Sequence, residues 1–228
     1  MGPEDAFDEH LTDDLPWTEV VGTLERLGWT PCGTGDWAVA LRSPSGTLAA
    51  RISPFDPAGP YSAMLYREAA HTRQVPELVD HRVLASGADL TVMEYLTPVP
   101  EGDGTAFQQL IARRDTSVAE LARCIASVHE RGAREQPWWG PLDDNPANVM
   151  RGSDGRLVVA DLFYADGPAL YAAVLSDPDR IVRDYPEHRR RYMTELPLAS
   201  SGGWAAGTAE RMRARLAAAD ERAAERAE

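Results

Sequence analysis

Lysine is absent from this 228-residue chain, and all 23 of its basic side chains are arginines. This absence excludes a lysine Schiff base and the lysine of a Walker A phosphate loop. Cysteine is scarce as well, because only Cys32 and Cys124 occur, far apart, in neither a disulfide framework nor a metal-ligand spacing. The scarcity and spacing of cysteine fit a protein of a reducing compartment, and we expect a cytoplasmic location.

Excess basic charge and long apolar runs are missing too. The net charge is −13, which argues against a general binder of nucleic acids or of anionic membranes. No apolar run approaches the roughly 18 residues of a membrane helix, and the acidic start of the chain lacks the apolar segment of a secretory signal. Hydrophobic residues still make up 43%, enough for a core. We therefore expect a globular protein with neither a nucleic acid nor a membrane as its partner.

The order of periodic segments predicts an α+β fold. Helical spacing occurs at 17–27 and 62–73, among strand-like runs at 36–42, 47–52, 82–85 and 90–96. Further along the chain, helical spacing of apolar residues occurs at 107–112, 117–131, 168–195 and 204–225, and a hairpin is expected at 148–161. The predicted organisation is an acidic tail at 1–15, a strand-rich part at 16–98, a helical part at 99–200 and a helix rich in Ala, Arg and Glu at 201–228. That last helix is either solvated, which its few large apolar residues favour, or a surface for a protein partner.

Residues 142–161 carry the clearest chemistry. They place Asp143, then Asn148 five residues on, and then Asp161 after a tight hairpin. Phosphoryl transfer needs one carboxylate to orient the acceptor hydroxyl, and an amide oxygen and a second carboxylate to hold Mg²⁺. A hairpin brings Asn148 and Asp161 to the same end. Taken alone, the segment is more typical of a polar turn before an ordinary hairpin.

With its wider context, the chain resembles the protein-kinase-like superfamily over about residues 30–165. Within that superfamily it is most similar to aminoglycoside phosphotransferases and small bacterial kinase-like proteins. Asp143, Pro146 and Asn148 match the D-x-x-P-x-N catalytic loop, and Asp161 matches the metal-binding Asp after it. The resemblance implies a bilobal protein-kinase-like fold with a small β-rich N-lobe and a reduced helical C-lobe. It also implies ATP and Mg²⁺ as cofactors, Asp143 as the catalytic residue, and Asn148 and Asp161 as metal ligands.

The same resemblance assigns nucleotide-binding roles in the strand-rich part. Arg51 stands where the family has its phosphate-binding lysine, and Glu68 is placed to form an ion pair with it. A glycine-rich nucleotide loop would contain Gly33 and Gly35, whose match to the family pattern is incomplete. The segment that would present its backbone to adenine contains Met93, Glu94 and Tyr95.

Several departures from the family pattern keep more than one function open. Arg51 replaces lysine, Pro141 stands where a histidine is usual, and Phe163 replaces the glycine of D-F-G. Only 67 residues follow Asp161, too few for the activation segment and peptide-docking helices of a protein kinase. We expect a phosphotransferase that acts on a hydroxyl, more readily of a small molecule than of a protein. One alternative is a pseudokinase, a nucleotide-sensing or protein-interaction module without turnover, and another is an unrelated α+β domain.

Overall fold

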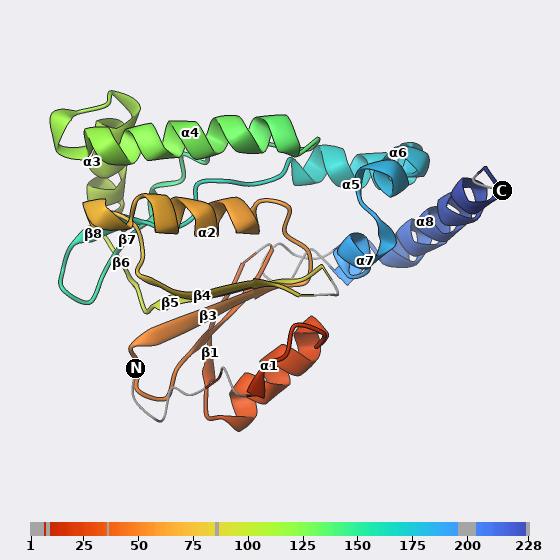
Figure 1. Cartoon of the computed structure of the whole chain (residues 1–228), viewed down its shortest axis with the longest axis horizontal. Helices are drawn as coiled ribbons and strands as arrows, with labels where there is room; N and C mark the ends of the chain where they lie inside the picture. Colours follow the sequence, from red (N-terminus) through yellow and green to blue (C-terminus); the bar gives the residue numbers. More distant parts are fainter. Residues whose placement is uncertain (1–6, 8–9, 36, 85–86, 196–203, 227–228) are drawn as a thin grey trace.

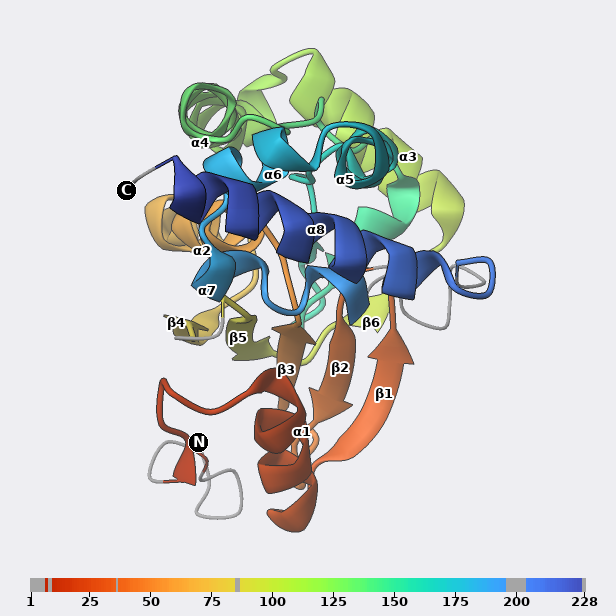
Figure 2. The same cartoon turned by 90° about the vertical axis from the view of Figure 1, so that its right-hand side faces the viewer.

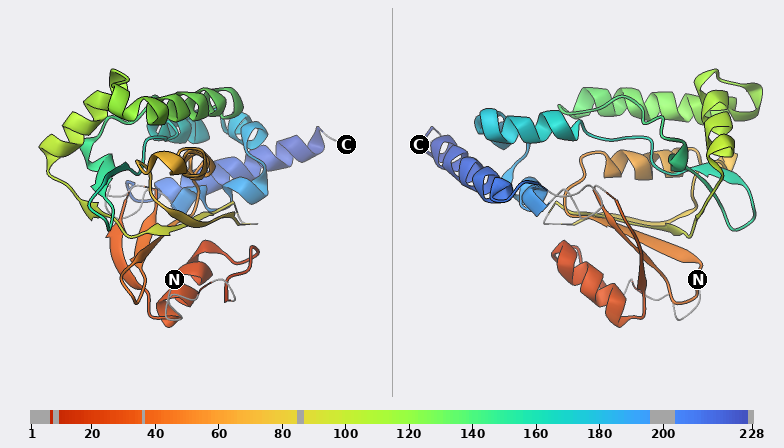
Figure 3. Two further views of the ribbon diagram at one scale, coloured as in Figure 1. Left: turned by 60° about the vertical axis from the view of Figure 1, so that its left-hand side comes forward. Right: turned by 180° about the vertical axis from the view of Figure 1, so that it is seen from behind.

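The structure is a computed structural model that describes residues 7, 10–35, 37–84, 87–195 and 204–226. Its N-lobe is a five-stranded antiparallel sheet with one helix on each face (Figure 1). The strands, in spatial order, are β1 (Thr30–Thr34), β2 (Val39–Arg42), β3 (Leu48–Ser53), β5 (Asp89–Glu94) and β4 (Leu78–Val83). Helix α1 (Trp17–Arg26) covers one face and α2 (Gly59–Glu68) covers the other (Figures 1 and 3).

Burial on both faces explains the sequences of the two central strands. Strands β3 and β5 are buried at almost every position, because α1 and α2 exclude water from both sides. On the α1 side, Val20 and Leu24 pack with Ile52, Leu90 and Val92 in one cluster. Strands β3 and β5 therefore show little of the alternation of buried and exposed residues that is typical of a strand with one solvated face.

The C-lobe is mainly helical. Helices α3 (Glu101–Ala112) and α4 (Ala119–Glu135) lie in the chain between the strands of a small sheet, because β6 (Thr97–Pro98) precedes them and β7 (Val149–Arg151) and β8 (Leu157–Val159) follow. Helix α4 lies on the far side of α2 from the large sheet (Figure 3). Leu65 and Tyr66 of α2 pack there with Leu121 and Ile125. Short helices α5 (Gly167–Ser176), α6 (Pro178–Asp184) and α7 (Glu187–Arg190) then lead to α8 (Thr208–Glu225).

The predicted α+β class, strand-rich first and helical afterwards, is confirmed. Strand β1 was missed, because Thr30–Thr34 contains a proline and a glycine and is exposed throughout. The expected helix at 168–195 is broken into three, since Pro178 starts one and Pro186 precedes the next. Within the described residues, no helix combines the length and the apolar character needed to cross a membrane.

Both ends of the described chain are more tightly packed than the sequence suggested. Phe7 and Leu11, in the stretch expected to be an acidic tail, are buried in the cluster beneath α1. Helix α8 lies against α5 and α6 (Figure 2). It is not solvated all round, because Met212, Leu216 and Ala219 are buried. Its apolar stripe is narrow but continuous at helical spacing, and it closes the hydrophobic core of the C-lobe.

Candidate active site

Backbone hydrogen bonds join the predicted catalytic loop to the segment that contains Asp161. The Asp143 N–H donates to the Leu162 carbonyl at 2.9 Å, and the Ala160 N–H donates to the Asn148 carbonyl at 2.8 Å. Asp161 lies between these two bonds along the chain. The sequence predicted that the hairpin would bring Asn148 and Asp161 together. The two backbone hydrogen bonds bring Asp143 to the same place.

The catalytic loop has a fixed internal geometry. The Asn145 N–H donates to Asp143 Oδ1 at 2.9 Å, and the Asn145 side chain accepts from the Ala147 N–H at 3.0 Å, which caps the 3₁₀ turn Pro146–Asn148. Gln108 of α3 donates to the Asn145 carbonyl at 2.7 Å. One carboxylate oxygen of Asp143 is thus held by the loop, and the other, Oδ2, is the atom that can accept from a bound hydroxyl.

A cavity of about 860 Å³ opens beside these residues, between the β1–β2 turn and the C-lobe. We call it the cleft; its lining includes Thr34, Gly35, Trp37, Asp143, Asp144, Asn148, Asp161 and Tyr164. Four predicted site residues, Gly35, Asp143, Asn148 and Asp161, therefore share one cavity. Gly33 lies on β1 and is not among its lining residues, so it is not brought to the site with Gly35.

Arg51 reaches the same place from β3, but its partner differs from the expected one. Its Nη1 lies 2.9 Å from Asp56 Oδ2, and its Nη2 lies 3.9 Å from Asp161 Oδ2. Glu68 is exposed at the last residue of α2, and the described contacts of Arg51 do not include it. A ten-residue helix is about 15 Å long, so a guanidinium held at its start cannot meet a carboxylate at its end. The predicted Arg51–Glu68 pair is thus wrong.

Asp56 is the partner of Arg51 that the sequence analysis missed. Its Oδ1 accepts from the N–H groups of Ala58 and Gly59, both at 2.9 Å, and so satisfies the start of α2. The available signal was an Asp just ahead of a helix, although the helix was expected to begin near Ser62. Further along α2, the Tyr66 hydroxyl donates to the Ala160 carbonyl, directly before Asp161.

The surroundings shift the pKa of several of these groups. Enclosure by the protein raises the pKa of Asp161 to about 6, and the nearby carboxylates of Asp56 and Asp143 add to this effect against the opposing charge of Arg51. Burial also raises the pKa of Asp56, which Arg51 partly counteracts. Burial alone would lower the pKa of Arg51, but the carboxylates around it outweigh that effect and raise it. Arg51 therefore remains charged at any physiological pH.

The expected adenine-binding segment is engaged in holding the lobes together. The buried Glu94 carboxylate pairs with Arg156 of the β7–β8 turn and accepts from the Glu77 N–H at 2.9 Å. The Glu94 N–H donates to the Glu77 carbonyl, and the Tyr95 N–H donates to the Thr47 carbonyl. These two N–H groups are therefore unavailable to a nucleotide. Met93 is half-buried and packs against the α2–α4 cluster.

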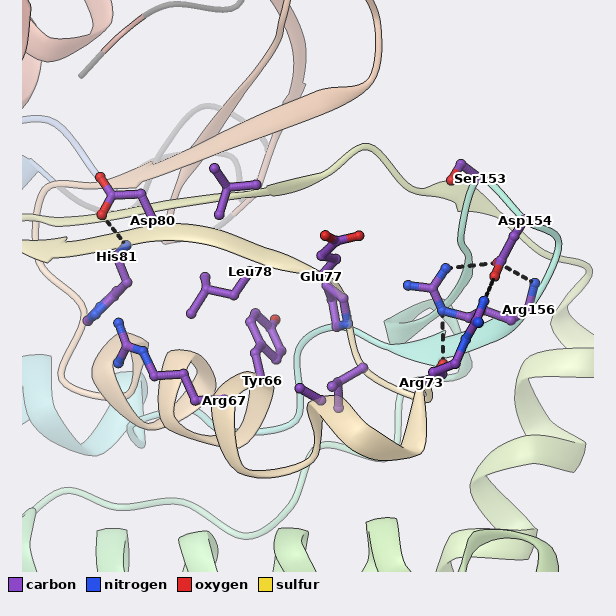
Figure 4. A pocket seen from close by; sticks show the side chains of 14 residues that line it. Tyr66, Arg67, Arg73, Glu77, Leu78, Asp80, His81, Ser153, Asp154 and Arg156 are labelled. Carbon is purple, nitrogen blue, oxygen red and sulfur yellow. Dashed lines mark hydrogen bonds and ion pairs between the residues drawn. The ribbon is translucent and has the colours of Figure 1, made fainter. Parts of the chain in front are cut away.

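A second cavity of about 710 Å³ lies between α2 and β4, and Figure 4 shows its lining. Arg73 and Arg156 converge on Asp154 at one end of it, and the Arg156 Nε also donates to the Arg73 carbonyl at 2.9 Å (Figure 4). Both arginines are already paired, so their contacts at this end of the cavity join the two lobes. We call the pairs of Arg156 with Glu94 and Asp154, and of Arg73 with Asp154, the inter-lobe bracket. Met93, Glu94 and Tyr95 are not among the lining residues of either cavity.

Trp37 ties the β1–β2 turn to the C-lobe, a role that the sequence did not indicate. Ser53 donates its hydroxyl to the Trp37 carbonyl, and the indole lies 6.2 Å, between ring centroids, from Tyr171 of α5. A Cβ on Gly167, at the start of α5, would lie only 3.0 Å from the indole. Trp37 therefore forms part of the cleft wall and anchors it to the C-lobe.

No protein-family model matches the chain, and no curated protein matches it. Solved structures that resemble it include the kinase domain of Mycobacterium tuberculosis PknI, at 17% identity over 83% of this chain and 96% of that one, with a TM-score of 0.34. A thermostable mutant of aminoglycoside phosphotransferase APH(4)-Ia, in complex with ADP and hygromycin B, is 15% identical over 86% and 97%, with a TM-score of 0.36. APH(3'')-Id from Streptomyces rimosus is 20% identical over 89% and 98%, with a TM-score of 0.31. Likenesses at this level assign no role to any residue of the cleft.

The residues of the cleft suit a magnesium ion that is bound together with phosphate. Carboxylate and amide oxygens are the ligands that Mg²⁺ prefers, and proteins commonly hold it by one or two carboxylates plus substrate phosphates. The described part of the chain has no group of three or more His, Cys, Asp or Glu residues that could form an all-protein metal cage. The buried Asn148 Nδ2 has no hydrogen-bond partner among the described residues, so this side chain has hydrogen-bonding capacity left for a ligand.

Proposed function

We propose that this protein is a phosphotransferase that uses ATP with Mg²⁺ and transfers a phosphoryl group to a hydroxyl of a small molecule. One observation carries the proposal: Asp143, Asn148 and Asp161 line one cavity, and Arg51 lies 3.9 Å from Asp161. Catalysis of phosphoryl transfer is mostly positioning and charge neutralisation, and these groups supply both.

Four residues in and beside the cleft have separate tasks. Asp143 Oδ2 accepts a hydrogen bond from the acceptor hydroxyl and orients it toward the phosphoryl group. The permanently charged Arg51 binds the phosphates from the N-lobe side. Asn148 and Asp161 would hold Mg²⁺, which when bound neutralises the charge that develops on the transferring group.

The cleft also limits the acceptor. A volume of about 860 Å³ lies within the roughly 300–1,000 Å³ typical of small-molecule sites. Carboxylates of Asp143, Asp144 and Asp161 line it beside the aromatic Trp37 and Tyr164. Negative charge of this density favours a neutral or positively charged acceptor over an acidic one.

A thermal-shift titration with ATP, with and without Mg²⁺, tests the nucleotide site first. A ligand that binds only the folded state stabilises it by about 2.7 kcal/mol at 100 times its Kd. We expect a Mg²⁺-dependent shift in the wild type that is lost in Asp161→Asn, followed by ATP consumption in a screen of hydroxylated acceptors. No shift of the wild type at millimolar ATP would refute the proposal.

A nucleotide-binding module without turnover is the second candidate. It is favoured by the position of Arg51, whose guanidinium lies beside the carboxylate that would hold the metal. Arg51→Lys separates the two candidates by phosphoryl-transfer rate. Lower activity in this variant supports an enzyme adapted to arginine, and activity that first appears with lysine supports a module that has lost turnover.

A further inference from the structure

Asp56 has a separate partner for each of its carboxylate oxygens. Oδ1 accepts from the N–H of Ala58, directly before α2, and from that of Gly59, its first residue, and Oδ2 pairs with Arg51 Nη1 at 2.9 Å. The Asp56 side chain is only 7% exposed, so these bonds are formed away from solvent. Charge-assisted hydrogen bonds of this kind fix orientation more firmly than surface ion pairs do.

We propose that Asp56 is the positioning residue for Arg51 and fills the role that the kinase-like resemblance gives to Glu68. This inference rests on the proposed function, in which Arg51 binds the phosphates of the nucleotide. It places the control of Arg51 at the first turn of α2, rather than in the body of that helix.

The other carboxylates near Arg51 are not available for this role. Asp89 is buried and already holds His81 Nε2 at 2.8 Å and the Thr91 hydroxyl at 3.2 Å. Asp161 is 3.9 Å from Arg51, which is beyond hydrogen-bond distance, and about half of its side chain is exposed. Asp56 is therefore the carboxylate that binds Arg51 directly, which leaves Nη2 directed toward Asp161.

Close packing holds the Asp56 turn in place. A Cβ on Gly59 would lie 2.6 Å from the Asp89 carboxylate, so the start of α2 lies directly against β5. The turn thus has an anchor in the central sheet as well as its bonds to the helix. Movement of Asp56, and of Arg51 with it, would require α2 to separate from β5.

The geometry also accounts for arginine in place of lysine. A guanidinium has two terminal nitrogens in a rigid plane, so Nη1 can stay on Asp56 while Nη2 binds an anion near Asp161. A single ammonium group has no such planar fork, and it would have to divide its hydrogen bonds between the two positions. Arg51 is thus suited to a support that lies beside it, at the helix start.

Binding measurements on Asp56→Asn test the inference, because asparagine still caps a helix but carries no charge. Affinities for Mg·ATP and for adenosine, which has no phosphates, are measured by calorimetry for this variant, Arg51→Met, the double variant and the control Glu68→Gln. We expect Asp56→Asn to weaken Mg·ATP binding about tenfold and to leave adenosine binding unchanged. The double variant should bind no more weakly than Arg51→Met, and Glu68→Gln should match the wild type.

The failures of the inference and of the proposed function are distinct. If Arg51→Met loses Mg·ATP affinity but Asp56→Asn keeps it, Asp56 does not position Arg51 and the proposed function stands. If the wild type binds neither Mg·ATP nor adenosine, the proposed function fails. Asp56→Ser, which caps by its hydroxyl, replaces the asparagine variant should that one not fold, and a loss of folding in both would make Asp56 structural only.

Discussion

Arg51 and Asp161 face each other across the lobes, with 3.9 Å between Nη2 and Oδ2. Arg51 belongs to the central sheet of the N-lobe, and Asp161 follows the last strand of the C-lobe. Each is held by its own surroundings, Arg51 by Asp56 and the Asp161 segment by the backbone of the catalytic loop. A ligand at this point meets a fixed cation and a carboxylate together, an arrangement that complements a phosphate beside a metal ion.

Mg²⁺-dependent nucleotide binding should weaken as the pH falls through about 6. Enclosure raises the pKa of Asp161 to about 6, and a protonated carboxyl group is a poor ligand for a hard cation. Kd values for Mg·ADP between about pH 3 and pH 8 would measure this, with metal-free ADP as the control for protonation of the nucleotide's own terminal phosphate. A midpoint near 4, the ordinary value of an aspartate, would contradict the prediction.

Asp161→Asn should bind Mg²⁺ poorly and yet melt at a slightly higher temperature at neutral pH. The folded pKa of about 6 lies above the unfolded value of about 3.9, so the folded state binds the proton more tightly. The stability supplied by this group is therefore present below about pH 4 and is lost as the pH rises through about 6. Asparagine does not ionise, and the difference in Tm should shrink toward pH 4.

Solvent reaches about half of the Asp161 side chain, so this difference in Tm should be small. Differential scanning calorimetry of both proteins across the pH range measures it. A variant that melts below the wild type at neutral pH would show that the Asp161 charge stabilises the fold, contrary to this expectation.

Gly104→Ala should disturb the catalytic loop from outside the cleft. A Cβ at Gly104 of α3 would lie 2.3 Å from the Pro146 carbonyl oxygen, so the helix and the loop must separate. We expect a loss of about 1–3 kcal/mol in the free energy of unfolding, together with weaker Mg²⁺-dependent binding.

Gly102→Ala is the matched control for this substitution, in the same helix. Nothing lies within 4 Å of a Cβ at Gly102, and alanine favours helix over glycine by up to about 1 kcal/mol. Urea unfolding should thus show that Gly104→Ala is destabilised and that Gly102→Ala is unchanged or more stable. Equal effects of the two would refute the steric argument.

Arg156→Met should loosen the bracket between the lobes. It leaves the Glu94 carboxylate, whose side chain is 9% exposed, without its cationic partner, and such losses cost about 3 kcal/mol or more. Glu94→Gln in the same background should restore part of the stability, because the uncompensated charge is removed. Chemical denaturation measures both.

Arg123→Met provides the surface comparison for Arg156→Met. Arg123 pairs with Glu120 on α4, where the two side chains are mostly or half exposed, and such solvent-screened pairs contribute little to stability. If both arginine variants lost the same stability, the buried pair would not be the cause.

The local part of the site could be predicted from the sequence, and the long-range part could not. Asp143, Asn148 and Asp161 lie close in the chain, and a hairpin limits where they can be. The partner of Arg51 depends instead on where α2 begins. That start is set by the bonds of Asp56 and by Gly59 against Asp89 of β5, contacts that no local pattern contains.

The same distinction explains α8 and Trp37. The stripe of Met212, Leu216 and Ala219 was present in the sequence, but the surface that covers it belongs to α5 and α6. Asp220 also pairs with the buried Arg190, the middle one of three consecutive arginines in the sequence. Trp37 stood beside the expected glycine loop, and its contact with Tyr171 exists only because the lobes meet.

The absence of lysine has a consequence for how this protein can be detected. Nucleotide derivatives with a reactive acyl phosphate mark their binding proteins by acylating an ε-amine near the phosphates, and this cleft offers a guanidinium instead. Surveys that depend on such labelling would pass over the wild-type chain even with the cleft saturated. Arg51→Lys would introduce the single ε-amine of the whole chain, so that any side-chain acylation would report on that one position.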